Sequence, residues 1–354
     1  MLAHSIINSL HHFPRSEPQR RAAVPTIFNY FDMKQNLHPI FKSQSYGRLA
    51  ALICYLCFSA TILTGQNPYI QITQHISGEL FLVPNPKVLV LLHPGSGPTD
   101  RNGNQKMMSN NSLLFLAQEL QRAGIAVFSI DKRVINQLKK GTITSKPDFD
   151  FDDQVEDLKS VIRFFLDSSR YEKLVTIGHS EGSLIGMLAM KAGADAFISL
   201  CGIADPAGQV IVQQIARQTP FLEELSQKYV DTLMMEKHIQ NVDPILRSLF
   251  REDMQDFLIT WFRHDPCKIL AEIKKPVLII DGDTDIQVDT EQGQKLQSCQ
   301  PLANYKTMEG MNHVLKKISP ADRKANMESY KNPELTIHPD LTPTIMDFLN
   351  TKIW

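Results

Sequence analysis

Short apolar runs alternate with helical patterns along most of the chain. The runs that predict strands are short and bounded by turn residues, and they span residues 69–73, 80–83, 88–92, 125–130, 174–177, 196–200, 277–280 and 305–308. Apolar residues spaced three and four apart predict helices over 113–120, 155–166, 184–190 and 345–349. The first two strands are expected to form a hairpin that turns at Ser77-Gly78. Because runs such as VLVLL are apolar on both faces, the pattern predicts an α/β fold whose mostly parallel sheet is covered by helices on both sides.

Residues 204–273 interrupt this alternation. Helical patterns over 210–216, 221–237 and 245–262 occur there without a clear strand. An insertion after the carboxyl end of a strand would lie over the sheet edge where open α/β proteins bind ligands, so it is a candidate lid. The alternative is a helical layer that only packs. Several apolar residues of the insertion would either line a pocket for acyl or aryl groups or form the core of the insertion itself. They are Phe221, Leu222, Leu225, Met234, Met235, Phe250, Phe257 and Trp261.

The first 65 residues have the pattern of a targeting segment rather than of a folded domain. Residues 49–63 carry no charge, follow the basic Lys42 and Arg48, and precede the breakers at 64–68. The run is shorter than the roughly 20 residues of a bilayer span and is typical of a signal peptide. We therefore expect export to the periplasm or the outside of the cell with cleavage near Gly65, leaving a domain over 66–354. An uncleaved membrane anchor and a buried helix are the alternatives, and translation from Met33 would give a signal peptide of ordinary length.

The strongest chemical signal is the sequence GHSEG at 178–182, which directly follows one predicted strand and precedes a predicted helix. A serine on such a tight turn projects its hydroxyl from the sheet, and the flanking glycines are needed because side chains there would collide with neighbouring backbone. The helix that begins near Glu181 directs its free N–H groups and its positive end to the same point. The pattern predicts Ser180 as a nucleophile, and a plain turn is the alternative.

A serine nucleophile needs a base and an orienting carboxylate, which in this architecture follow in the order Ser, acid, His. An acidic turn with the sequence DGDTDIQV lies at 281–288, directly after a predicted strand. Asp285 stands at the Gly-x-x-Asp spacing that reaches around to the histidine. Asp283 is the second choice for the acid, and Asp281 is expected to end the strand.

The predicted base is His313, which ends the turn after the last predicted strand. His338 is the other histidine that follows this strand, and we expect it in a surface loop because Pro339 comes next. His179 is the variable residue of the serine turn, and His93 ends a strand, so neither is expected to take part in the chemistry.

A glycine-rich turn with the sequence HPGSGPTDRNGN lies at 93–104. Its backbone can face the serine, and the N–H of Ser96 is predicted to join the N–H of Glu181 as an oxyanion hole. The competing interpretation is a phosphate-binding loop, but the third glycine of the dinucleotide motif and the Gly-Lys-Ser/Thr of a P-loop are both absent. Asp100 and Arg101 are expected to shape the turn by pairing with each other or with its backbone, and a direct substrate role for Arg101 is the alternative.

Composition excludes several classes of protein. The chain has 37 Lys plus Arg and 38 Asp plus Glu, a formal net charge of −1, which argues against nucleic-acid binding through a basic surface. Hydrophobic residues at 43% and charged residues at 21% are ordinary for a globular protein. The cysteines show no zinc-type spacing, so no metal is expected. After cleavage Cys201, Cys267 and Cys299 would remain, and we expect each to be a small core residue.

These motifs together resemble the α/β-hydrolase superfamily, and within it a bacterial carboxylesterase-like group. The group's motifs GSGPxDRxGN, GHSEGSLI, GDxDxQV and GMNHVLK appear here at 95–104, 178–185, 282–288 and 310–316. Asp131-Lys132-Arg133, and Trp261 with Asp265-Pro266, match further positions of the group. The resemblance covers 69–354. The chain departs from the group at 134–136, where Val-Ile-Asn replaces Gly-x-Gly, and at His93-Pro94.

The resemblance implies an eight-stranded α/β-hydrolase sheet and hydrolysis of a carboxylic ester through an acyl-enzyme. Beyond the resemblance, we expect the substrate to be a short acyl ester. Ser180 would attack the carbonyl, His313 would carry the proton, Asp285 would orient the imidazole, and two backbone N–H groups would bind the oxyanion. A serine aminopeptidase stays open, for which Glu181 or Glu223 would have to face the substrate, as do a thioesterase and a non-catalytic binding module. No cofactor is implied. The expected partner is a small ester, a membrane partner is expected only if 49–63 stays uncleaved, and the oligomeric state is open.

Overall fold

The computed structural model describes residues 67–142 and 148–354. The predicted extension 1–65, including the signal segment 49–63 and the alternative start at Met33, lies outside the described residues. Within the described ranges, no helix is both long enough and apolar enough to cross a bilayer.

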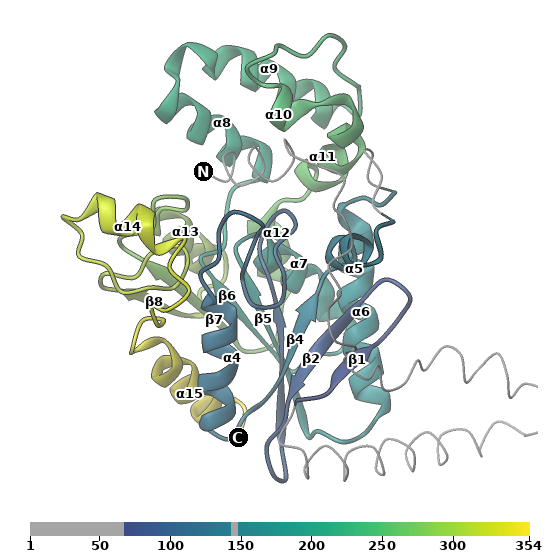
Figure 1. Ribbon diagram of the computed structural model, residues 1–354, viewed down its shortest axis with the longest axis vertical. Coiled ribbons are helices and arrows are strands. Elements are labelled where there is room, and N and C mark those ends of the chain that lie inside the picture. Colours follow the sequence, from purple (N-terminus) through teal and green to yellow (C-terminus); the bar gives the residue numbers. More distant parts are fainter. Residues whose placement is uncertain (1–66, 143–147) are drawn as a thin grey trace, which may run out of the picture.

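One eight-stranded sheet forms the centre of the described chain (Figure 1). Its strands are β1 Tyr69–Gln71, β2 Ser77–Phe81, β3 Val88–His93, β4 Ala126–Asp131, β5 Lys173–His179, β6 Ala196–Leu200, β7 Val277–Gly282 and β8 Asn304–Met308. Their order across the sheet is β1-β2-β4-β3-β5-β6-β7-β8. Only the β1·β2 and β2·β4 pairs are antiparallel. The predicted mostly parallel α/β architecture is confirmed.

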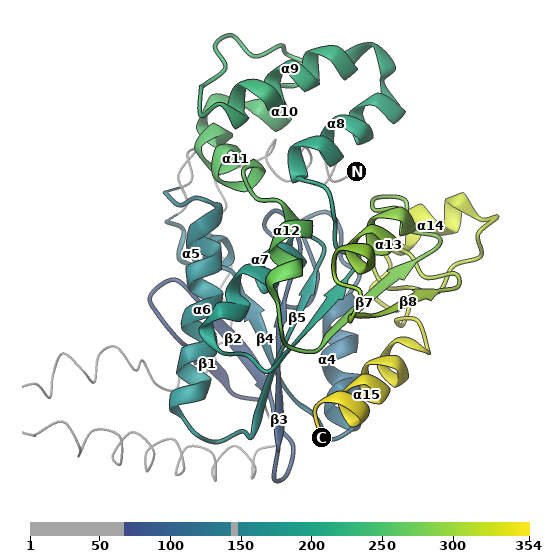
Figure 2. The same cartoon turned by 180° about the vertical axis from the view of Figure 1, so that it is seen from behind.

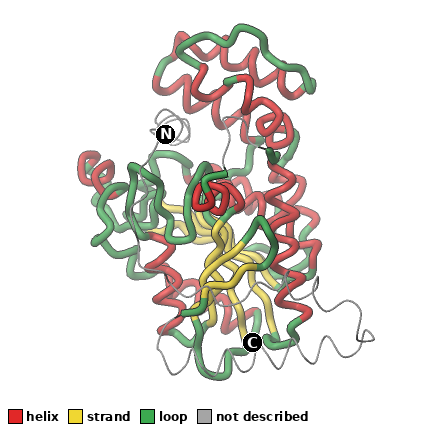
Figure 3. The backbone as a smooth tube through the Cα atoms, turned by 45° about the vertical axis from the view of Figure 1, so that its right-hand side comes forward, coloured by secondary structure: helices red, strands yellow, loops and turns green. Residues whose placement is uncertain are grey.

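Helices cover both faces of the sheet, as Figures 1 and 2 show from opposite sides. The helices nearest the sheet are α4 Ser112–Arg122, α5 Arg133–Lys140, α6 Phe151–Asp167, α7 Glu181–Ala189, α13 Thr290–Cys299 and α15 Leu341–Lys352, with the short η1 Met190–Ala192 after α7. Alternate residues of a strand point to opposite faces. In β3, Val90 therefore packs in the core under α4 and α15, whereas Leu91 packs in the core under α6 and α7. Figure 3 shows the strands enclosed by these helices.

Three helices near the sheet edge were not predicted: α5, α13 and α14 (Arg323–Ser329). Helix α13 buries only Gly293 and Leu296, so its sequence carries almost no apolar periodicity. Helix α5 includes the segment 134–136, where the sequence has Val-Ile-Asn in place of the expected Gly-x-Gly, and Gly141 with φ 66° caps its carboxyl end.

The predicted hairpin exists, but its turn was placed wrongly. Residues 72–76 make the turn, closed by the N–H of Ile72 donating to the carbonyl of Ile76, while Ser77 and Gly78 are strand residues of β2. Gly78 is required for a different reason: a Cβ there would lie 2.6 Å from the ring of Phe128 on β4. A glycine that permits close packing was taken for a turn signal.

The insertion 204–273 contains helices and no strand, with a non-helical segment at 235–246. It contains α8 Ala207–Gln218, η2 Pro220–Leu222, α9 Glu223–Met234, α10 Arg247–Phe250, η3 Glu252–Met254, α11 Gln255–Phe262 and α12 Pro266–Glu272. Helices α8 to α11 stand together beyond the carboxyl ends of the strands, and α12 returns the chain to the sheet (Figures 1 and 2).

The apolar residues of the insertion are partly buried in the core and partly exposed to solvent. Leu222, Phe250 and Trp261 are buried, and the ring of Tyr229 packs edge-on against Phe250 at 5.4 Å. Leu225 and Phe257 are partly buried against the same core. Phe221, Met234 and Met235 are exposed. The insertion therefore packs partly on itself and partly on α6, where Trp261 stacks on Phe151 at 5.9 Å.

Cys267 and Cys299 form a disulfide that joins α12 to α13. The expectation that each is a small core residue was wrong for these two, and only Cys201 is a free, buried thiol among the described residues. Spacing along the chain does not reveal such a pair, because the two cysteines meet through the packing of α12 on α13.

This disulfide is expected to stabilise the fold by about 3 to 4 kcal/mol, because it closes a loop with a sequence separation of 32 residues. Cys267→Ser/Cys299→Ser should unfold at lower guanidinium concentration than the oxidised chain. Reducing agent should lower the midpoint of the wild type to that of the variant and leave the variant unchanged. A wild-type midpoint that does not respond to complete reduction would contradict the assignment.

Candidate active site

Ser180 occupies the turn between β5 and α7 with φ 55° and ψ −122°. A positive φ is uncommon for a residue other than glycine and persists only where the surroundings enforce it. The flanking glycines make this possible. A Cβ on Gly182 would lie 2.6 Å from the carbonyl oxygen of Pro94, and one on Gly178 would collide with the backbone of Gly182. The serine is thereby fixed at the carboxyl end of the sheet, and it is 4% exposed.

The structure brings His313 and Asp285 together. His313 Nδ1 lies 2.7 Å from Asp285 Oδ2, and both side chains are buried. The other carboxylate oxygen accepts hydrogen bonds from the backbone N–H groups of Gln287 at 2.7 Å and Val288 at 2.9 Å. Because the carboxylate engages Nδ1, Nε2 is the ring nitrogen left for proton transfer.

The other two aspartates of this turn have different surroundings. Asp283 Oδ1 accepts from the N–H of Gly310 at 2.6 Å and so links the acid turn to the histidine turn. Asp281 lies near the end of β7, with its carboxylate buried beside Tyr305 and the backbone of Gly293. Burial, aided by the charge of Asp285, raises the pKa of Asp281 to about 8. A Cβ on Gly293 would collide with the Asp281 carboxylate, so glycine is required there.

A cavity of about 190 Å³ lies against Ser180 and His313. Its apolar lining includes Met108, Val314 and Met327, and no residue of the insertion as described lines it. The cavity is therefore formed by the turns that leave the sheet and by the segment around α14.

The turn after β3 carries the second group of predicted residues. Asp100 Oδ1 accepts from two backbone N–H groups of this turn, including that of Asn104 at 2.9 Å, and so shapes it as expected. Arg101 does not line the cavity. Its side chain donates to Glu79 at 3.0 Å and to Asp131 at 2.9 Å, which ties the turn to β2 and β4 rather than to a substrate.

Ser96 lines the cavity beside Ser180. The two turns touch at Gly95, where a Cβ would lie 3.1 Å from Ser180 Cβ. The carbonyl oxygen of Ser96 accepts from Thr99 Oγ1 at 2.7 Å, which fixes the backbone on that side. Glu181 begins α7 directly after the serine, so its backbone N–H lies at the N-terminus of that helix.

The Glu181 side chain is buried, with Oε1 3.8 Å from Lys132 Nζ. Burial raises the pKa of Glu181 and lowers that of Lys132. Lys132 also donates to the carbonyl oxygen of Gly95 at 2.5 Å. The Glu181 side chain does not line the cavity.

His179 is the residue that sequence reasoning missed. It lines the cavity, and its Nε2 lies 2.8 Å from the carbonyl oxygen of His313, so it holds the histidine turn against the serine turn. Burial lowers the pKa of His179 to about 3, which keeps the ring neutral. Its place between the two glycines of GHSEG was the available signal.

Within the described ranges, His179, Cys201 and His313 form a group whose potential ligand atoms all lie within 4.8 Å. One nitrogen of each ring makes a contact within the protein: His179 Nε2 contacts the His313 carbonyl, and His313 Nδ1 contacts Asp285.

His338 was wrongly expected in a surface loop. It is 2% exposed, and its Nε2 lies 3.0 Å from the carbonyl oxygen of Glu309. The proline that follows it bends the chain at the start of α15 without exposing the histidine. His93 does end β3; burial and the nearby Lys132 charge lower its pKa to about 3.

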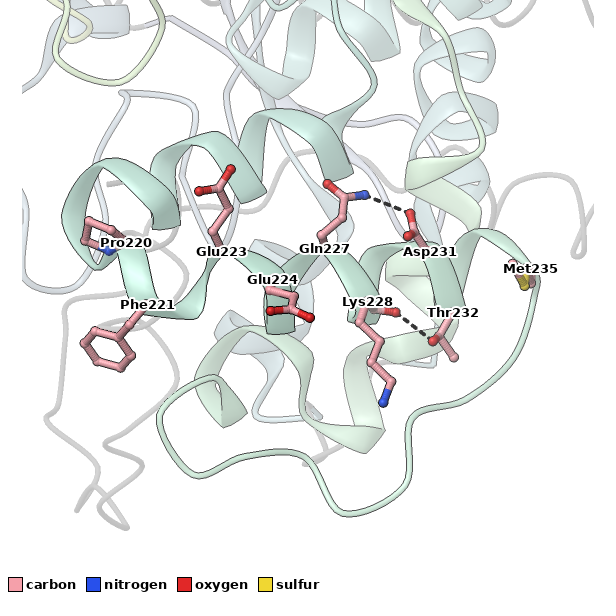
Figure 4. A pocket seen from close by; sticks show the side chains of 9 residues that line it. All are labelled: Pro220, Phe221, Glu223, Glu224, Gln227, Lys228, Asp231, Thr232 and Met235. Carbon is pink, nitrogen blue, oxygen red and sulfur yellow. Dashed lines mark hydrogen bonds between the residues drawn. The ribbon is translucent and has the colours of Figure 1, made fainter.

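A second, open hollow of about 790 Å³ lies on α9 and the residues next to it (Figure 4). Glu223 and Glu224 line it together with the exposed Phe221 and Met235. It shares no lining residue with the cavity at Ser180. Glu223 therefore lies outside the site that holds the predicted nucleophile.

Comparison with known proteins shows likeness in structure only. No family model matches the chain, and no curated protein matches it. Est1E from Butyrivibrio proteoclasticus is similar over 81% of this chain and 100% of its own, at 14% identity and a TM-score of 0.50. Est1E with bound ferulic acid gives 14% identity, 81% and 99% coverage, and a TM-score of 0.51. Esterase Pf2001 from Pyrococcus furiosus gives 13% identity, 82% and 91% coverage, and a TM-score of 0.49. The chain has the α/β-hydrolase fold.

The buried Asp281 is expected to make stability depend on pH. Its pKa is higher in the folded chain than in the unfolded one, so it costs nothing below about pH 4 and increasingly destabilises the fold as the pH rises to about 8. Asp281→Asn removes this titration and should raise the guanidinium midpoint more at pH 8.5 than at pH 5. An equal change at both pH values would rule out this explanation.

Proposed function

We propose that this chain is a serine hydrolase that cleaves carboxylic esters through a Ser-His-Asp triad. The observation that carries the proposal is the 2.7 Å contact of His313 with Asp285 beside a cavity that also holds Ser180 on its strained turn. A plain turn needs neither the positive φ of the serine nor a carboxylate-bound histidine on the same cavity. The order Ser, Asp, His along the chain is that of the fold's serine enzymes.

In the proposed reaction, Ser180 Oγ attacks the carbonyl carbon of the ester while its proton passes to His313 Nε2. The resulting oxyanion is bound by the N–H groups of Ser96 and Glu181. The tetrahedral intermediate breaks its bond to the alcohol, which leaves with the proton from His313. Water then repeats the sequence on the acyl-enzyme, releasing the acid and restoring the serine. Asp285 holds the imidazole and stabilises its cationic form.

The small volume of the cavity supports a substrate whose acyl group is short. About 190 Å³ is below the roughly 300 Å³ at which pockets for larger ligands begin. Met108, Val314 and Met327 offer apolar contacts for an alkyl chain. Est1E, which shares the fold, has been seen with ferulic acid bound, so the fold accommodates an aromatic acid as well.

The alternatives of the same fold find less support. An aminopeptidase needs an acid that faces the substrate ammonium, yet Glu181 is buried beside Lys132 and Glu223 lies on the hollow of α9. A thioesterase would use the same triad and the same cavity, so it stays the second candidate.

The proposed location outside the cytoplasm rests on the segment 49–63 and on one structural feature. Disulfides persist in oxidising compartments and are rare in the cytosol. The Cys267–Cys299 bond therefore supports export. The alternative, a membrane anchor over 49–63, is equally compatible with a folded domain in an oxidising compartment.

The triad roles predict graded losses of activity. Ser180→Ala and His313→Ala should each lower kcat by about a millionfold, and Asp285→Asn by about ten-thousandfold, because the asparagine favours the wrong imidazole tautomer. The measurement is steady-state hydrolysis of p-nitrophenyl butyrate by the purified domain. The matched control is Asp283→Asn, which keeps an acceptor for Gly310 and should stay within about tenfold of the wild type. Loss of activity in the control with an active Asp285→Asn would reverse the acid assignment.

The size of the cavity predicts selectivity for the acyl chain. Over a series of p-nitrophenyl esters from acetate to palmitate, kcat/KM should be highest for acetate to hexanoate and should fall for longer chains. A p-nitrophenyl thioester and an aminoacyl anilide in the same assay separate the two alternatives. A maximum at long chains would mean that the acyl group binds outside the 190 Å³ cavity.

A further inference from the structure

Lys132 is a buried lysine whose position the proposed triad does not explain. It follows β4 directly, its side chain is 2% exposed, and its Nζ donates to the carbonyl oxygen of Gly95 at 2.5 Å. Burying an amino group is costly unless it is paired and hydrogen-bonded. Here the amine reaches the one backbone carbonyl that precedes Ser96.

We propose that Lys132 is a positioning residue for the oxyanion hole: through its hydrogen bond to the Gly95 carbonyl, it orients the peptide whose N–H belongs to Ser96. This inference rests on the proposed function, since it assumes that Ser180 attacks a carbonyl at this site. Lys132 itself does not line the cavity and is not assigned a contact with the substrate.

The geometry of a single peptide unit carries the argument. The Gly95–Ser96 peptide is trans, since the described chain contains no cis peptide bond, so its C=O and N–H point in opposite directions. A donor that holds the carbonyl therefore directs the N–H away from itself. Ser96 lines the cavity and Gly95 packs on Ser180, so we infer that the N–H of Ser96 faces the nucleophile when Lys132 holds the Gly95 carbonyl.

The neighbouring peptide is fixed independently. The Ser96 carbonyl accepts from Thr99 Oγ1 at 2.7 Å and from Gln105 Nε2 at 3.2 Å. With both carbonyls bound, rotation of either peptide would break a buried hydrogen bond. The hydrogen bond from Lys132 to the Gly95 carbonyl also polarises the Gly95–Ser96 peptide, which makes the N–H of Ser96 a stronger donor.

The Glu181 side chain links Lys132 to the second predicted oxyanion donor, the backbone N–H of Glu181. Its Oε1 lies 3.8 Å from Lys132 Nζ, and its own backbone N–H is the second member of the proposed oxyanion hole. One buried pair therefore links the two turns that supply the two N–H groups. Other groups near it are His93, which burial keeps neutral, and Gln154 of α6. Whether the pair is charged or neutral, the amine keeps a hydrogen to donate to Gly95.

The Asp131-Lys132-Arg133 segment contacts the turn after β3 at a second point. Asp131 accepts from the backbone N–H of Arg101 at 3.1 Å and from its side chain at 2.9 Å. Arg133 instead binds Asp157 of α6 at 2.6 Å. Asp131 and Lys132 thus anchor the end of β4 to the turn after β3, and Arg133 anchors it to α6.

The test compares Lys132→Met with the wild type in ester hydrolysis and in binding of a trifluoromethyl ketone, which forms an oxyanion when serine adds to it. Because the single change leaves Glu181 without its partner, Lys132→Met/Glu181→Gln is the second variant. Both should lose about 10- to 100-fold in kcat with KM within about threefold, since removing an oxyanion donor outright costs about 100- to 1,000-fold. Affinity for the ketone should fall by the same factor as kcat/KM.

The matched control is Lys191→Met, which removes an exposed lysine that pairs with Glu272 at 3.2 Å, and it should leave every value unchanged. Melting temperatures separate a loss of stability from a loss of oxyanion binding. A double variant that keeps kcat and ketone affinity within twofold of the wild type would overturn the proposal. So would failure of both variants to fold, because Lys132 would then be a structural residue.

Failure of the proposed function can be distinguished from failure of the Lys132 proposal. If the wild type hydrolyses no ester but a fluorophosphonate labels Ser180, the ester assignment is wrong, and the labelling rate of the same variants, which also depends on the oxyanion hole, tests Lys132 with the same expected factor. If the wild type is not labelled at all, both proposals are overturned.

Discussion

The parallel register of the sheet is the constraint on which the whole site depends. In the β3·β5 pair His93 lies opposite Gly178, so the turns that leave these strands begin side by side. In the β7·β8 pair Gly282 lies opposite Met308, which does the same for the turns that carry Asp285 and His313. Hydrogen bonds in the strands, formed far from any substrate, thus bring together residues that are distant along the chain. A shift of one residue in either pair would separate the groups and invert the faces of a fully buried strand.

Close backbone contacts at the ends of these strands then fix the conformation of the serine turn. Gly178 and Gly182 leave no room for a side chain, and this crowding holds Ser180 at φ 55°. Such strain, like the buried Asp281 carboxyl, costs stability that the apolar layers on both faces of the sheet must offset. The elements that carry the site pack on a large core, and hydrogen bonds join its turns, as between Asp283 and the N–H of Gly310 and between His179 and the carbonyl of His313.

The sequence predicted what depends on local pattern. Buried strands of the VLVLL kind, the glycine-flanked Ser180 and the turns around Asp285 and His313 are all recognisable because chain direction and periodicity determine them. The features that were missed depend on tertiary contact. The Cys267–Cys299 pair, the buried His338 and the contact of His179 with the His313 carbonyl all join segments whose approach no local pattern encodes. Gly78 shows the same limit, since a glycine needed for packing on Phe128 looks like one needed for a turn.

Both ends of the helical insertion are fastened to the same helix. At its start, the backbone N–H groups of Ala204 and Asp205 donate to Gln292 of α13, at 2.8 and 3.1 Å. At its end, Cys267 is bonded to Cys299, the last residue of α13. Since α13 follows the turn that carries Asp285, the insertion is anchored beside the acid of the candidate triad. No residue of the insertion lines the cavity at Ser180, so the turns that leave the sheet, and not α8 to α11, determine the geometry of the predicted reacting groups.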